Sequence, residues 1–293
     1  MMKRVITITL RMCAAALLFV NSGCGGKAVS AQQAQTGAEG AETKSGAHVN
    51  VSAKTAAPSA AVMAVVNNID MVLVKGGTFT MGSDAPIELD CCTNGRPAHS
   101  VTLDDYYIGA FAVTQKLWVA VMGGNPSFFR GDDLPVEQVS WNDAHQFIEK
   151  LNALTGKKYR LPTESEWEYA ARGGEKSNGY KYAGGNDLNE VAWYTGNGGG
   201  KTNAVGSKKP NELLIYDMSG NVWEWVYDRH TSKYDPEPKT NPRGPEKGDY
   251  RVLRGGSWAD RSRDDYFRAD YRNYSSPNDQ GYFYGFRLAL TPD

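Results

Sequence analysis

The chain has 293 residues, of which 32 are Lys or Arg and 33 are Asp or Glu, so its formal net charge is −1. General nucleic-acid binding requires a large basic excess, and this balance argues against a nucleic-acid partner. No apolar run reaches the roughly 18–20 residues that a transmembrane helix needs, which excludes a polytopic membrane protein. With 32 Gly, 7 Trp and 16 Tyr, the composition favours many loops held by aromatic side chains over a helical bundle.

Residues 1–23 are expected to be a signal peptide. Lys3 and Arg4 precede a mostly apolar stretch, which is typical of secretion. Small residues directly before Cys24 resemble a bacterial lipoprotein signal, in which that cysteine carries the lipid. Asn21 departs from the usual pattern, which has Leu three residues before the cysteine, so simple secretion is the alternative. The prediction is a protein anchored in the bacterial outer membrane at the cell surface, touching the membrane through its lipid alone.

Residues 24–66 are expected to form a flexible tether. The stretch is rich in Ala, Gly, Ser, Thr, Gln and Lys and has no hydrophobic period. Such a segment cannot bury enough apolar area to offset the entropy of ordering it. Its part from Gly25 to about Ala61, about 37 residues, has a root-mean-square reach of ~35 Å. The folded domain is then expected over 67–293.

Apolar runs and alternation predict short strands over most of this domain. They are expected at 71–74, 77–82, 101–108, 252–253 and 286–290. One helix is predicted from Thr114 and another from Ser140 to a stop at Gly156. Their apolar faces are Leu117, Trp118 and Val121 in the first helix and Ala144, Phe147, Ile148 and Leu151 in the second.

A third, short helix is predicted after Pro162. Thr163 and Glu166 have the spacing of a capping box, which is a strong start signal. Glu164 and Glu168 belong to the same acidic series. We interpret this series as capping and solvated charge rather than as catalytic carboxylates.

Six phrases occur along the domain in a fixed order and spacing. They are Met71-Val72 to Gly82, Pro135 to Trp141, Tyr159 to Gly174, Asn211 to Trp225, Arg254-Gly255-Gly256-Ser257-Trp258 and Gly285-Phe286-Arg287-Leu288. Together they resemble the sulfatase-modifying-factor family, whose domain is of the formylglycine-generating-enzyme type. The resemblance covers nearly all of 67–293. It implies an α+β domain with a C-type lectin-like fold, few helices, and many short strands and loops.

The resemblance does not by itself imply enzymatic activity. The family's formylglycine-generating enzymes use two cysteines shortly after the Gly-Gly-Ser-aromatic phrase, and these thiols bind copper. Residues 259–266 contain no cysteine, and no carboxylate or amide can replace a thiolate there. We therefore expect that the protein binds no copper and is not an enzyme. Cys91 and Cys92 lie in the wrong part of the domain to substitute; being adjacent, they bridge only through a strained ring, and their role stays open.

The same resemblance implies a structural calcium ion. By position, Asp217 and Glu224 would supply side-chain oxygens, and Gly220 and Val222 would supply backbone carbonyls. Hard oxygen ligands on a tight loop suit Ca²⁺. The alternative is that Glu224 only accepts a hydrogen bond within the loop.

Residues 259–284 have an unusual composition. Among these 26 residues are five Tyr, five Asp and four Arg, and no Val, Ile, Leu or Met. Tyr and Arg are typical of antibody-like contact surfaces and of binding hot spots. Lys, Glu, Met and Trp total 46 of 293 residues, so about four would be expected here, yet none occurs. Those four residue types cannot be reached from an AAC or AAT codon by changing only its adenines.

The layout of a fixed frame around this segment resembles the variable proteins of diversity-generating retroelements, including treponeme-type variable lipoproteins. The resemblance implies a non-catalytic binding protein whose C-terminal segment is diversified. Arg268 and Arg272 are not counted among the ligand contacts, because we expect them to be framework residues that form internal salt bridges. The predicted ligand contacts are Trp258, Asp260, Arg261, Arg263, Asp264, Asp265, Tyr266, Phe267, Asp270, Tyr271, Asn273, Tyr274, Tyr282 and Tyr284.

Three alternatives remain open at this point. The segment could be a solvated loop without a ligand, the protein a fixed structural lipoprotein of the envelope, or the domain an enzyme of unknown chemistry. The partner is expected to be a protein or another surface ligand, which the sequence does not identify.

Overall fold

The computed structural model describes residues 57–84, 95–261 and 264–292, with the backbone alone at Asp264. These residues belong to one compact unit, Lys54–Asp293. Several predicted features lie outside the described residues. They are the expected signal peptide, Cys24, most of the expected tether, the Cys91-Cys92 pair and Arg263. Within them, no helix is both long enough and apolar enough to cross a membrane.

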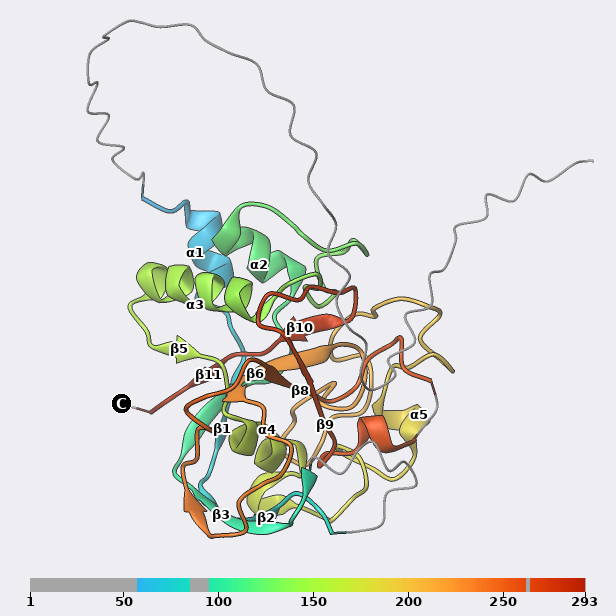
Figure 1. Ribbon diagram of the computed structural model, residues 1–293. Helices are drawn as coiled ribbons and strands as arrows, with labels where there is room; N and C mark the ends of the chain where they lie inside the picture. Colours follow the sequence, from blue (N-terminus) through green and yellow to red (C-terminus); the bar gives the residue numbers. More distant parts are fainter. Residues whose placement is uncertain (1–56, 85–94, 262–263, 293) are drawn as a thin grey trace, which may run out of the picture. The chain divides into compact units, whose positions relative to one another are not determined.

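Three small sheets form the framework (Figure 1). The first has the order β1-β4-β11-β5, with β1 (Met71–Val74), β4 (Tyr106–Gly109), β11 (Ala289–Leu290) and β5 (Tyr159–Arg160). The second has the order β10-β6-β8-β9, with β10 (Tyr284–Phe286), β6 (Trp223–Arg229), β8 (Arg251–Arg254) and β9 (Arg272–Ser275). The third has the order β2-β3-β7, with β2 (Gly77–Met81), β3 (His99–Leu103) and β7 (Lys239–Thr240).

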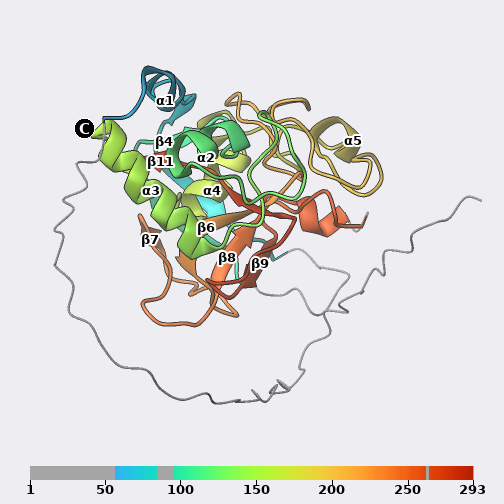
Figure 2. The ribbon, with the colours of Figure 1, turned by 90° about the horizontal axis from the view of Figure 1, so that it is seen from above.

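Five short helices and two 3₁₀ turns complete the described chain. They are α1 (Ala60–Val66), α2 (Gln115–Met122), α3 (Trp141–Thr155), α4 (Glu164–Ala171), α5 (Leu188–Val191), η2 (Gly174–Lys176) and η3 (Asp264–Phe267). Figure 1 shows α1, α2 and α3 together at one end of the domain, and Figure 2 looks down on them. Few helices and many short strands confirm the predicted α+β class.

The predicted helix boundaries follow from local capping chemistry. The side chain of Thr114 accepts a hydrogen bond from the Leu117 amide, 3.2 Å long, at the start of α2. Ser140 and Asp143 form a capping box at α3, and Thr163 and Glu166 form one at α4. Gly156 ends α3 in the left-handed conformation, with φ of 71°, which a glycine adopts without strain.

Three expected boundaries are wrong. The strand expected at 286–290 is split into the end of β10 and β11, which belong to different sheets. Helix α1 lies inside the segment expected to be a tether, so the ordered domain begins before residue 67. Its side chains pack against the core cluster of α2 and α3, and Val66 is buried; this burial stabilises a helix too short to form alone. The strand expected at 101–108 is two strands, β3 and β4, separated by Asp104 and Asp105.

Candidate functional site

The segment 259–284 contributes to both edges of the second sheet. It leaves the sheet after β8, passes through η3 and returns as β9, which pairs antiparallel with β8. Its last residue, Tyr284, begins β10, which pairs parallel with β6 at the opposite edge. Between these edges the chain crosses the start of α3, where Gln280 donates a 2.7 Å hydrogen bond to Asp143. The segment is therefore held at several points along its length.

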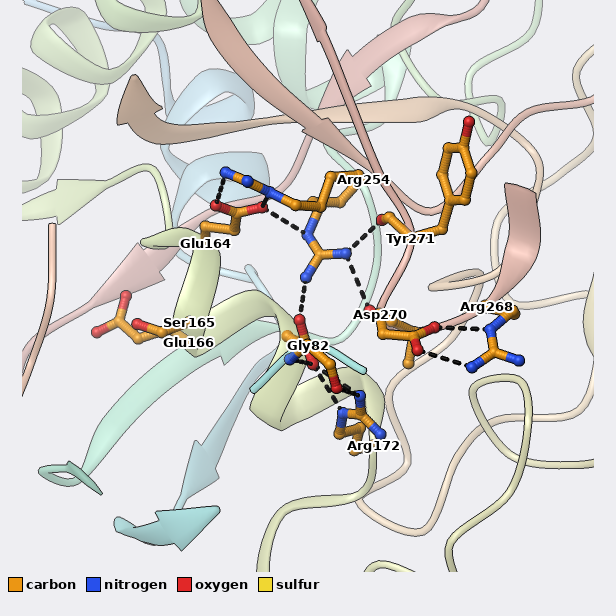
Figure 3. A network of polar contacts seen from close by, with 12 residues as sticks. Gly82, Glu164, Ser165, Glu166, Arg172, Arg254, Arg268, Asp270 and Tyr271 are labelled. Carbon is orange, nitrogen blue, oxygen red and sulfur yellow. Dashed lines mark hydrogen bonds and ion pairs between the residues drawn. The ribbon is translucent and has the colours of Figure 1, made fainter. Parts of the chain in front are cut away.

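A buried network of ion pairs lies beneath this segment (Figure 3). Arg272 donates two hydrogen bonds to Glu164, of 2.6 and 2.7 Å. Arg254 pairs with Glu168 and lies 3.3 Å from Glu164. Arg172 also pairs with Glu168, at 2.8 Å. All of these groups except Arg172 are buried, so the interpretation of Glu164 and Glu168 as solvated charge is wrong.

The network ties helix α4 to the segment's backbone as well. Arg254 donates hydrogen bonds to the carbonyl oxygens of Ala269, at 3.0 Å, and of Tyr271. Burial raises the pKa of Glu164, but the neighbouring guanidinium groups of Arg272 and Arg254 outweigh it and hold that pKa below its usual value. Paired charges of this kind are costly to break, because one uncompensated charge would stay buried. The framework role expected for Arg272 is confirmed.

Three of the predicted contact residues are exposed: Arg261, Tyr274 and Tyr282. Phe267 is fully buried and packs beside Leu188 and Val191 of α5, so its prediction as a contact is wrong. Arg263 and the side chain of Asp264 lie outside the described residues. The others are partly buried, namely Trp258, Asp260, Asp265, Tyr266, Asp270, Tyr271, Asn273 and Tyr284.

Two of the partly buried acids have structural partners. One Asp260 oxygen accepts hydrogen bonds from the amide and the hydroxyl of Ser257, at 2.8 and 2.7 Å. Asp270 accepts two from Arg268, at 2.8 and 2.7 Å, which confirms Arg268 as a framework residue. We therefore infer that Asp260 and Asp270 stabilise the loop and do not contact the ligand.

A group of four aromatic rings joins the segment to a loop elsewhere in the chain. Tyr282 lies edge-on to Phe128, with ring centroids 5.1 Å apart, and Trp258 lies edge-on to Phe129 at 5.3 Å. The two phenylalanines are themselves 5.1 Å apart. Phe128 is 62% exposed and Tyr282 48%. We call Phe128, Phe129, Trp258 and Tyr282 the aromatic patch.

A second aromatic group surrounds Tyr274. Its ring stacks on His230 at 3.9 Å and lies 5.2 Å from the ring of Tyr250. Tyr274 is 41% exposed and Tyr250 48%. The sequence reasoning missed Phe128, Phe129 and Tyr250 because they lie outside 259–284. The adjacent phenylalanines between Pro126 and Gly131 were a usable signal, since two consecutive rings in a short polar loop cannot easily both reach the core.

Two of the predicted calcium ligands, Asp217 and Glu224, are buried carboxylates. Asp217 is buried, and one of its oxygens has no hydrogen-bond partner among the described residues. Burial raises the pKa of Asp217 to about 6, and the charge of Glu224 adds to the rise. Glu224 accepts two hydrogen bonds from Arg287 and one from Trp167, which leaves part of its acceptor capacity free. The orphaned Asp217 oxygen fits a hard cation, whereas the three hydrogen bonds that Glu224 already accepts weaken the fit.

A family model matches residues 57–292, and its description is "Sulfatase-modifying factor enzyme 1-like domain". The chaperone protein LppX of Paenibacillus barcinonensis is 37% identical, over 64% of this chain and 78% of that protein. The formylglycine-generating enzyme of Thermomonospora curvata is 35% identical, over 76% and 93%.

Among solved structures, Treponema denticola variable protein 1 superposes with a TM-score of 0.69 and 33% identity, over 76% of this chain and 95% of that one. PvdO of Pseudomonas aeruginosa gives 0.66 and 28%, over 76% and 94%. The predicted C-type lectin-like fold of the formylglycine-generating-enzyme type is confirmed. The relatives thus include proteins named as enzymes and proteins that are not. Because the match includes all of its described residues, the chain belongs to the sulfatase-modifying factor enzyme 1-like family.

Proposed function

We propose that this protein is a non-catalytic, surface-displayed binding protein that contacts its ligand through the segment 259–284. The observation that carries the proposal is that some side chains of this segment are buried or ion-paired while others are exposed. Arg272, Arg268 and Phe267 are committed to the core and the ion pairs, while Arg261, Tyr274 and Tyr282 are exposed. Side chains can therefore change at the surface while the frame stays in place, as a diversified receptor requires.

The chemistry of the exposed groups suits a protein ligand. Tyr and Trp offer large rigid contact areas at little entropic cost, and an arginine adds directional hydrogen bonds. The aromatic patch gives a hydrophobic centre of the type found in binding hot spots. Similarity to Treponema denticola variable protein 1 supports the proposal, since that protein is named as a variable protein. In this proposal a lipid on Cys24 holds the domain at the outer membrane.

The decisive experiment is to sequence the 3′ end of the gene, with its downstream region, in many cells. The proposal expects substitutions at adenine positions of codons 259–284, next to a near-copy repeat and a reverse transcriptase gene. It further expects the codons of Arg261, Tyr274 and Tyr282 to vary and those of Phe267 and Arg272 to stay constant. An unvarying 3′ end without these neighbours would contradict diversification.

A second candidate function follows from the 37% identity to a protein named as a chaperone. A chaperone-like protein would use a fixed surface to bind other proteins, and its gene would not vary. The aromatic patch would then be its contact, because Phe128 and Phe129 lie outside the segment. Substituting Phe128 by Ala would reduce binding in both cases, so the sequencing experiment is what separates the two.

A further inference from the structure

A cavity of about 470 Å³ is lined by none of the exposed contact residues Arg261, Tyr274 and Tyr282. It lies between the start of α4, the end of β6 and the loop that follows β6. Glu164 and Asp228 line it together with Lys233, Tyr234 and Arg243. Arg272 is its only lining residue from 259–284 within the described chain. The volume is in the range of about 300–1,000 Å³ that small-molecule sites occupy.

The lining of this cavity has a positive balance of charge. Its basic side chains are Arg229, Lys233, Lys239, Arg243 and Arg272, and its acidic ones are Glu164, Asp228 and Asp235. Two acids are neutralised by partners already in the wall: Glu164 by Arg272, and Asp235 by Lys239 at 2.5 Å.

The third acid, Asp228, contributes little negative charge at neutral pH. It is buried, and burial followed by the charge of Glu164 raises its pKa to about 8. Two of the remaining cations make contacts with uncharged groups: Arg229 donates to the Gly248 carbonyl, and Arg243 lies 4.3 Å from the Tyr227 ring. Among the described lining residues, Arg229, Lys233 and Arg243 therefore have no ion-pair partner in the wall.

An unsatisfied hydroxyl lies in the same wall. The Tyr234 ring is 4.2 Å from the Arg272 guanidinium and 4.7 Å from the His99 ring. Its hydroxyl is buried and has no hydrogen-bond partner among the described residues. A buried polar group without a partner is destabilising, and such groups call for a specific explanation, such as a bound ion or water.

We propose that this cavity is a second ligand site, which takes a small organic anion carrying a carboxylate or phosphate group. The anion enters between the basic side chains, with Lys233 at the mouth. The Tyr234 hydroxyl donates a hydrogen bond to one of its oxygens. Charge-assisted hydrogen bonds of this type are stronger than neutral ones. The site is independent of the proposed contact surface, so either can fail without the other.

The test measures the melting temperature of the full chain with inorganic phosphate, with succinate, and with chloride at matched ionic strength. The proposal expects at least one of the two probes to raise the melting temperature above the chloride value. A phosphate-specific rise assigns a phosphate ligand, and a succinate-specific rise assigns a carboxylate ligand. Equal melting temperatures in all three salts would overturn the proposal.

Two variants and a matched control locate the binding. Lys233→Gln is expected to weaken binding about tenfold, the effect of losing roughly 1.4 kcal/mol of interaction. Lys201→Gln removes an exposed lysine that does not line the cavity and is expected to bind as the unaltered protein does. Equal effects of the two substitutions would show that any binding is elsewhere.

Tyr234→Phe separates a ligand contact from a structural role. Removing an unpaired buried hydroxyl should leave the melting temperature of the unliganded protein unchanged or raise it. The same variant should lose most of the shift produced by the anion. A variant that keeps the full shift would contradict the role given to the hydroxyl, and a variant destabilised without ligand would indicate a structural partner instead.

Discussion

Arg272 lies inside the segment 259–284, and Glu164, 108 residues earlier, is the first residue of α4; their side chains meet in two hydrogen bonds of 2.6 and 2.7 Å. Both side chains are buried. The pair couples the stability of the core to one position of the segment.

Replacing Arg272 by Met should therefore destabilise the domain by about 3–5 kcal/mol, because Glu164 would stay buried without its partner. Arg261→Met, at an exposed position of the same segment, should change the unfolding free energy by about 0.5 kcal/mol or less. Urea denaturation of both variants measures the difference. Similar losses in the two variants would refute the separation into frame and surface.

Phe267 and Tyr282 should likewise respond differently to truncation. Phe267 is buried, and an atom of its ring lies 2.8 Å from the position that a Cβ on Gly256 would occupy. We expect Phe267→Ala to cost about 3–5 kcal/mol, as for other buried aromatic residues. Tyr282→Ala should cost about 1 kcal/mol or less, since the ring is half exposed and mainly loses its contact with Phe128. Thermal or chemical unfolding would decide, and the reverse order would be inconsistent with this structure.

The calcium prediction can be tested through Asp217. If the ion binds, calcium at 100 times its dissociation constant should stabilise the protein by about 2.7 kcal/mol. Asp217→Asn keeps an acceptor for the Gly206 amide, which donates at 2.7 Å, but it removes the charge that attracts the ion. The variant should therefore lose the response to calcium. Equal melting temperatures of the unaltered protein in calcium and in chelator would exclude the site, and an equal response to magnesium would exclude selectivity for calcium.

Asp228 should make stability fall as the pH rises. Its pKa is raised to about 8 in the folded protein, first by burial and then by Glu164, against a usual value near 4. Between these values the folded state holds a proton that the unfolded state has released, so stability decreases from about pH 4 to about pH 8.

Asp228→Asn removes this titration and keeps an oxygen that can accept from the Glu164 amide, as Asp228 does at 2.8 Å. The variant's unfolding free energy should therefore decline less steeply over this pH interval. The measurement is urea denaturation at several pH values, with the difference between the two proteins as the readout. Parallel profiles would rule out a perturbed Asp228.

Local signals predicted the helix starts, because a capping box depends on residues three positions apart. Thr163 with Glu166 is an example that the structure confirms. Burial of Glu168 was not predictable in this way. Its partner Arg254 lies 86 residues later, and only the tertiary fold brings them together.

The contact surface was predicted only in part, because it too depends on residues that only the tertiary fold brings together. Composition marked the segment 259–284 but could not sort its members, so Phe267 was counted among the contacts. Sorting them requires the strand pairing of β8 with β9 and the position of η3 against α5. Phe128 came from a distant loop, and no period or motif connects it with Tyr282.

The attachment of the segment at both edges of one sheet has a practical consequence. A combinatorial library that randomises Arg261, Tyr274 and Tyr282 while keeping Phe267 and Arg272 would sample new specificities without rebuilding the hydrophobic core. Members of such a library should express at similar yields and unfold at similar temperatures. The domain is thus a natural starting point for engineered affinity reagents that contain no antibody framework.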